Sequence, residues 1–97
     1  MSFRKSLTGK GGLIMAVKGY VLIGTEVGTA KSVADHLRVL EYEKATILAV
    51  DTVTGPYDVI AQLEAEDLNK LGVCITEAIQ TIHGVVHTTT CLTIILN

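Results

Sequence analysis

The chain has 97 residues, which is enough for one small domain and too few for a catalytic fold built from two lobes. Hydrophobic residues make up 48% of it and charged residues 19%, a balance that excludes an intrinsically disordered chain and a charged coiled coil. Three basic residues, Arg4, Lys5 and Lys10, lie in the first fourteen residues, which contain no acid, so residues 15–97 carry a net charge of about −5. A surface of that sign disfavours direct binding of nucleic acid.

The first fourteen residues differ from the rest of the chain. They are basic and rich in glycine, and they lack apolar periodicity. We expect residues 1–14 to be a flexible leader or an artificial extension, with a basic arm that contacts an anionic partner as the alternative. Residues 15–97 are then a single domain.

Neither the apolar runs nor the cysteines indicate a membrane or secreted protein. The longest runs, at residues 20–23 and 92–96, are far shorter than the ~20 residues that span a bilayer. Cys74 and Cys91 have neither the spacing of a metal or redox pair nor the density of a disulfide scaffold. We therefore expect a cytoplasmic protein whose thiols pack as small hydrophobes.

The first two predicted elements are a strand and a helix. Residues 18–25 form a short apolar run of strand-forming residues between glycines and a turn, which predicts a buried strand. An amphipathic helix follows, with Thr29 as its expected N-cap. Its apolar side chains recur every three or four residues, at Ala30, Val33, Ala34, Leu37 and Leu40.

The second half of the chain is predicted to contain a two-stranded hairpin, a second helix and a last strand. Residues 46–54 and 58–65 predict a hairpin. A second helix starts near Glu66 and Asp67, where acids suit the positive end of the helix dipole, and Gly84 ends it. Residues 85–96 are almost entirely β-branched or aliphatic and predict a long last strand.

The predicted order β-α-β-β-α-β is that of a ferredoxin-like α+β fold, with two helices on one face of a four-stranded antiparallel sheet. The other face is apolar whether Tyr20 and Leu22 or Val21 and Ile23 occupy it. Exposed apolar patches of that size usually mark an interface. We therefore predict a homodimer closed sheet against sheet as a dimeric α/β barrel, with higher assembly plausible.

The loop between the two hairpin strands concentrates unusual residue types, TGPYD at residues 54–58. Gly55 allows a ligand to approach the backbone, Tyr57 offers a ring and a hydroxyl, and Asp58 can pair with an ammonium group. An α-amino acid would suit such a loop. The alternative is structural: Gly55 and Pro56 turn the chain and Asp58 caps a local N–H.

The last strand carries hydroxyls on an otherwise apolar sequence. Thr88 and Thr90 face one side and Thr89 the other, and hydroxyls presented to a cavity bind a carboxylate or an amide. Threonine is also favoured in strands without any functional role.

Together the two segments resemble the effector-binding (RAM) domain of the Lrp/AsnC family of transcription regulators, over roughly residues 17–95. The resemblance rests on two motifs. One is T-G-x-Y-D at 54–58, and the other is an I-x-G-V-x-x-T-x-T pattern at Ile82, Gly84, Val85, Thr88 and Thr90. The resemblance implies binding of an amino acid or related effector between subunits, with a change in assembly, through Gly55, Tyr57, Asp58, Thr88 and Thr90. We expect the stand-alone type without a helix-turn-helix, homo-oligomeric and able to associate with full-length regulators.

Other interpretations stay open. An ACT-like module would bind an amino acid at the turn of residues 26–29, and a co-assembly partner of full-length regulators would need no ligand. A small dimeric α/β-barrel enzyme is disfavoured because His36, His83, His87 and Cys74 form no recognisable nucleophile and base pair. His83 and His87 are four apart but flank the helix-ending Gly84, so we expect no metal, no cofactor and no enzyme activity.

Overall fold

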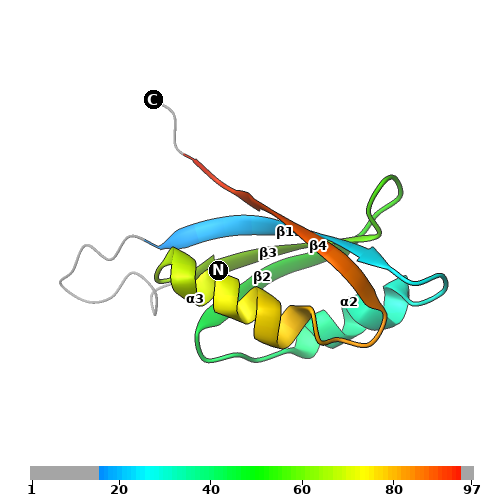
Figure 1. Cartoon of the computed structure of the whole chain (residues 1–97), viewed down its shortest axis with the longest axis horizontal. Coiled ribbons are helices and arrows are strands. Elements are labelled where there is room, and N and C mark those ends of the chain that lie inside the picture. The colour runs from blue at the N-terminus through cyan, green and yellow to red at the C-terminus, as the bar shows by residue number, and fades with distance from the viewer. Residues whose placement is uncertain (1–15, 95–97) are drawn as a thin grey trace.

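The structure, a computed structural model, describes residues 16–94, so the predicted leader at residues 1–14 lies outside the described residues. Its elements confirm the predicted order and the ferredoxin-like α+β fold (Figure 1). They are β1 (Val17–Thr25), α2 (Ala30–Val39), β2 (Ala45–Thr52), β3 (Val59–Ala65), α3 (Leu68–Cys74), the π-helix η1 (Ile75–Ile79) and β4 (Val85–Leu92). No helix within this part of the chain is long and apolar enough to cross a membrane.

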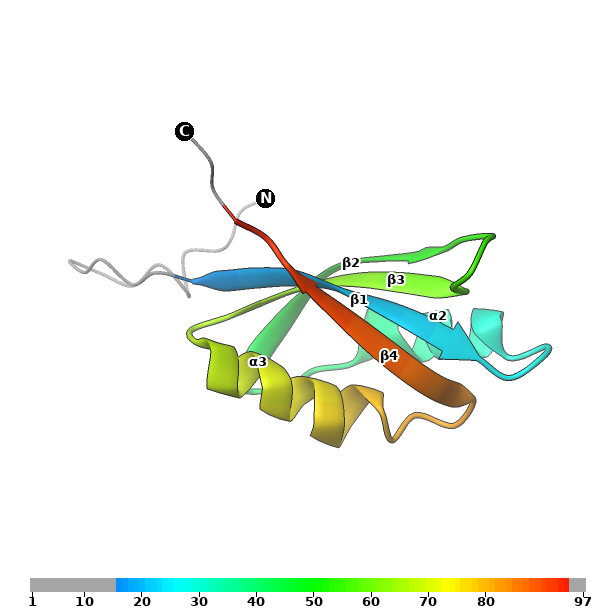
Figure 2. The ribbon, with the colours of Figure 1, turned by 45° about the horizontal axis from the view of Figure 1, so that its top comes forward.

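The four strands form one antiparallel sheet in the order β2-β3-β1-β4. Both helices lie on the same side of this sheet, and β4 follows its edge (Figure 2). The core is the layer between sheet and helices, and its largest fully buried side chains come from both: Ile23, Leu37, Leu63, Leu71 and Ile79. Burial of this apolar layer is what holds the helices against the sheet.

Strand register decides which residues face the open side of the sheet. Val21 and Ile23 are fully buried beneath the helices, so Tyr20 and Leu22 face the open side. On β4, Thr90 pairs with Val21 and Thr88 with Ile23, which places both threonines on the helix side. The open side of β4 is formed by His87, Thr89 and Cys91, opposite Gly24, Leu22 and Tyr20.

Several element ends differ from the predictions. Thr29 occupies the N-cap position of α2, but its hydroxyl donates to the carbonyl of Glu26 at 2.8 Å and caps no helical N–H. The start of α3 agrees with the predicted one near Glu66 and Asp67, because the side chain of Asp67 accepts from the Lys70 N–H at 2.8 Å and caps the helix. The last strand ends at Leu92, short of the predicted residue 96, although the Thr93 N–H still donates to the carbonyl of Lys18.

The second helix is not α-helical throughout. Over Ile75–Ile79 it widens into a π turn, and the Gln80 N–H donates to the carbonyl of Ile75 at 2.8 Å. A π turn contains one extra residue, so every later position is rotated by about 100° relative to a continuous α-helix. Gln80 directly follows the π turn as its C-cap residue.

Candidate ligand-binding site

The TGPYD hairpin projects beyond the end of the sheet between β2 and β3. A backbone hydrogen bond of 2.9 Å from the Val53 N–H to the carbonyl of Asp58 closes its base. Gly55 at the tip has a φ of +135°, a conformation that residues with a side chain rarely adopt, and a Cβ there would meet no atom within 4 Å. The space beside the tip at Gly55 is therefore open.

Asp58 joins this hairpin to the end of β1. Its N–H donates to the carbonyl of Ile23 at 2.9 Å, and its Oδ2 accepts from the Thr25 N–H at 2.8 Å. Thr25 lies at a β-bulge, where the register between β1 and β4 shifts. One carboxylate oxygen thus satisfies a backbone donor, which is the structural interpretation that the sequence left open, and the half-buried side chain remains at the hairpin's edge.

Tyr57 reaches from the hairpin across the open face to β4. Its phenolic oxygen lies 3.2 Å from Thr89 Oγ1, within hydrogen-bonding distance, and its ring centroid is 5.8 Å from that of His87. The His87 imidazole in turn lies over Gly24, where a Cβ would come within 2.3 Å of its Cε1. Thr89, His87 and Gly24 were not among the predicted site residues, because only strand register shows that they share a face with Tyr57.

Thr88 and Thr90 lie on the opposite side of the sheet from Tyr57. Thr88 Oγ1 accepts from the Gln80 amide at 2.9 Å, and Thr90 is exposed. The structure therefore divides the predicted site residues into two groups on two faces: the hairpin group of Gly55, Tyr57 and Asp58, and the edge-strand pair of Thr88 and Thr90. Sequence reasoning also missed Gln80, which directly follows the π turn and contacts Thr88.

The candidate catalytic side chains are dispersed. Burial raises the pKa of the Cys74 thiol from 9.0 to about 11, which makes it a poor nucleophile, and His36 and His83 are exposed. His87 lies against the ring of Tyr57. Within residues 16–94, no group of three or more His, Cys, Asp and Glu side chains is placed to hold a metal ion.

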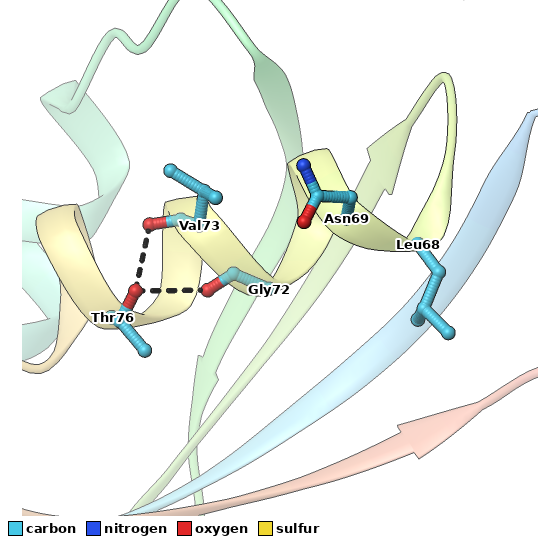
Figure 3. Close-up of a pocket in the computed structure, with 5 residues that line it drawn as sticks. All are labelled: Leu68, Asn69, Gly72, Val73 and Thr76. Carbon is cyan, nitrogen blue, oxygen red and sulfur yellow. Dashed lines mark hydrogen bonds between the residues drawn. The ribbon is translucent and has the colours of Figure 1, made fainter.

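The structure also has a shallow depression away from these residues. It is lined by one face of α3 and the start of η1, namely Leu68, Asn69, Gly72, Val73 and Thr76 (Figure 3). The Thr76 hydroxyl donates to the carbonyls of Gly72 and Val73, so it is already used within the helix. The depression includes none of the predicted site residues.

Comparison with known proteins agrees with this geometry. Residues 18–94 match the family model of the Lrp/AsnC ligand binding domain, a class of small α+β domain. The chain therefore belongs to the Lrp/AsnC ligand-binding domain family, which favours that interpretation over an ACT-like module. Among curated proteins, no sequence matches this chain.

Solved structures show the same architecture. The crystal structure of FFRP-DM1 is 27% identical, with 80% of this chain and 99% of that chain covered and a TM-score of 0.72. TTHA0845 from Thermus thermophilus is 26% identical, with 84% and 96% covered and a TM-score of 0.73. The regulator NMB0573 from Neisseria meningitidis, solved as a complex with L-Met, is 16% identical, with 80% and 49% covered and a TM-score of 0.68, and shows the fold alone.

Proposed function

We propose that this chain is an effector-sensing domain that binds an amino acid or a similar small molecule between subunits and thereby changes the assembly of the subunits. Membership of the Lrp/AsnC ligand-binding family supports the class of function. The complex of NMB0573 with L-Met supports an amino acid as the ligand. The predicted site residues Gly55, Tyr57, Asp58, Thr88 and Thr90 are part of this proposal.

The observation that carries the intersubunit site is the division of these residues between two faces. Tyr57 contacts Thr89 on the open face, whereas Thr88 and Thr90 face the helix side of the same strand. A ligand the size of an amino acid does not reach both groups around one sheet. If both groups bind one ligand, the hairpin group comes from one chain and the edge-strand pair from another.

The open face of the sheet is where we place the partner chain of the homodimer. Because two packed open faces leave Thr88 and Thr90 on the outer, helix side of each sheet, the edge-strand pair that meets a hairpin comes from a chain of a neighbouring dimer in a higher assembly. Apart from Lys18 at the start of β1, which lies on the same face, the side chains named here carry no formal charge: Tyr20 is 40% exposed, Leu22 is half-buried, and Thr89 and Cys91 are exposed. The Gln62 amide donates to the Tyr20 hydroxyl at 3.2 Å, which pairs these two polar groups within this face. Packing two such faces together gives the homodimer of a dimeric α/β barrel.

Control of assembly follows from mass action. A ligand that contacts two chains binds only the assembly that presents both, so its binding free energy stabilises that assembly. No covalent chemistry is needed, and we assign no enzyme activity and no cofactor. The free Cys74 and Cys91 fit a reducing, cytoplasmic compartment, and full-length regulators of the same family are candidate partners.

A thermal-shift screen of the twenty standard amino acids, with light scattering on the same samples, tests the proposal. At about 100 times its dissociation constant a ligand adds about 2.7 kcal/mol of stability. In a domain of this size that raises the unfolding midpoint by several degrees. We expect at least one amino acid to raise both the midpoint and the assembly mass. A folded oligomer that responds to none contradicts amino-acid sensing and favours a co-assembly partner that needs no ligand.

A further inference from the structure

Gln80 connects the second helix to the edge-strand pair through its side chain. Its Nε2 donates to Thr88 Oγ1 at 2.9 Å. The side chain is exposed and Thr88 is half-buried at the edge of the sheet. The π turn fixes the backbone of Gln80, because the Gln80 N–H donates to the carbonyl of Ile75 at 2.8 Å. The contact therefore links a fixed helix end to a predicted ligand-binding hydroxyl.

This hydrogen bond determines the polarity of the Thr88 hydroxyl. A threonine hydroxyl has one proton to donate and accepts through its lone pairs. Because the amide of Gln80 occupies an acceptor position, the Thr88 proton is left to point away from Gln80. Thr88 then offers a donor to whatever lies against the edge of the sheet.

A donor in this position selects among ligand groups. A carboxylate only accepts hydrogen bonds, and an ammonium group only donates them. Hydrogen bonds to an ionised acceptor are roughly twice as strong as neutral ones. We infer that Gln80 is a positioning residue that holds Thr88 as a donor and so directs the carboxylate end of the effector to Thr88. This inference rests on the proposed function, and it adds which end of the ligand the edge-strand pair binds.

The substitution Gln80→Glu reverses this polarity. A glutamate carboxylate has no proton to donate, so it would accept a hydrogen bond from the Thr88 hydroxyl. The hydroxyl proton would then no longer be available to the ligand. It also adds a negative charge beside the ligand carboxylate. Asn69→Asp is the matched control, because it converts an exposed amide of the same helix, placed in the depression away from Thr88, into a carboxylate.

The experiment measures binding by calorimetry with two kinds of probe: the twenty standard L-amino acids, and the carboxamide of each one that binds the unsubstituted protein. We expect the amino acid to bind about tenfold more tightly than its carboxamide. In Gln80→Glu we expect the affinity for the amino acid to fall by about tenfold or more, with the affinity for the carboxamide within about threefold of its original value. Asn69→Asp should change neither.

A double-substitution cycle tests whether Gln80 acts through Thr88. Thr88→Val should weaken binding of the amino acid to a similar extent. In the Thr88→Val background, Gln80→Glu should then reduce the affinity for the amino acid much less than it does in the unsubstituted protein. Additive losses, or an unchanged preference between acid and carboxamide in Gln80→Glu, would overturn the inference while leaving the proposed function in place. If the unsubstituted protein binds no amino acid, the proposed function and this inference both fail.

Discussion

The imidazole of His87 occupies the space that a side chain at Gly24 would need. A Cβ at Gly24 would lie 2.3 Å from Cε1 of His87 and 2.8 Å from each ring nitrogen. The same imidazole contacts the ring of Tyr57, with the two centroids 5.8 Å apart. A glycine in β1 therefore positions a ring of β4, and that ring lies against the hairpin motif.

Replacing this glycine tests the relationship. Gly24→Ala should displace the exposed imidazole and lower the free energy of unfolding by about 0.5–1 kcal/mol, roughly the contribution of the lost contact between the rings of His87 and Tyr57. In a His87→Ala background the space is empty, and Gly24→Ala should be neutral or slightly stabilising because it restricts the unfolded chain. Chemical denaturation at one fixed protein concentration measures both values. Equal effects in the two backgrounds would show that the two residues do not interact.

Asp58 combines a structural bond with a proposed role in ligand binding, and two substitutions separate them. Asp58→Ala removes the acceptor for the Thr25 N–H and should cost roughly 1–2 kcal/mol of stability. Asp58→Asn keeps a carbonyl oxygen for that N–H but loses the negative charge, so it should retain stability and lose affinity for a ligand with an ammonium group. Denaturation and calorimetry measure the two properties. Unchanged amino-acid affinity in Asp58→Asn would remove the carboxylate from the proposed site.

The two cysteines report separately on the core and on the open face. Burial raises the pKa of Cys74 to about 11, so at pH 8 its thiol should resist iodoacetamide while the protein is folded. Cys91 is exposed on the open face and should react in the monomer. If the open faces pair, its modification should slow as the protein concentration rises through the dimerisation range. Mass spectrometry of Cys91 at increasing concentrations measures this, with Cys91→Ser as the control, and a constant rate would contradict pairing through this face.

Tyr42 provides a pH-dependent contact between the loop before β2 and the π-helix. The Tyr42 hydroxyl donates a hydrogen bond of 2.7 Å to the Glu77 carboxylate, and this bond, aided by desolvation, raises the pKa of Tyr42 from 10.0 to about 12. A raised pKa favours the protonated phenol in the folded state. The stabilisation is therefore complete below about pH 10 and is lost as the pH rises from there to about 12.

A spectroscopic titration of the tyrosines checks this assignment. The unsubstituted protein should show an ionisation step of Tyr42 near pH 12, and Tyr42→Phe should remove that step. Glu77→Gln should lower its pKa toward 10. Stability measured against pH should decline between pH 10 and 12 less in Tyr42→Phe than in the parent. A high-pH step that persists in Tyr42→Phe would assign it to another residue.

Periodicity alone predicted the element order, because each strand and helix has a clear apolar pattern. It did not predict which face of β1 is open, since Tyr20 and Leu22 are nearly as apolar as Val21 and Ile23. That choice depends on which set the helices cover. The same is true of β4, where only pairing with β1 shows that Thr89, and not Thr88, shares a face with Tyr57.

The sequence also did not predict the local irregularities of the backbone. The bulges at Gly24/Thr25 and Ile47/Ala49 and the π turn each add one residue to a regular element, and their sequences carry no distinct signal. Their consequences are nevertheless specific. The Thr25 N–H, next to the first bulge, donates to Asp58, and Gln80, directly after the π turn, donates to Thr88. The hairpin residues could be predicted because glycine, proline, tyrosine and aspartate together form a motif, whereas Gln80 is an ordinary residue on a helix.

Complementation between two inactive chains is the most direct test of a site shared by subunits. One chain carries Asp58→Asn and the other carries Thr88→Val with Thr90→Val, so neither should bind the amino acid on its own. After denaturation and refolding as an equal mixture, random pairing should restore about a quarter of the sites, each with its hairpin from one chain and its threonines from the other. Calorimetry of the mixture measures that stoichiometry. A mixture that binds no better than either chain alone would contradict a site built from two subunits.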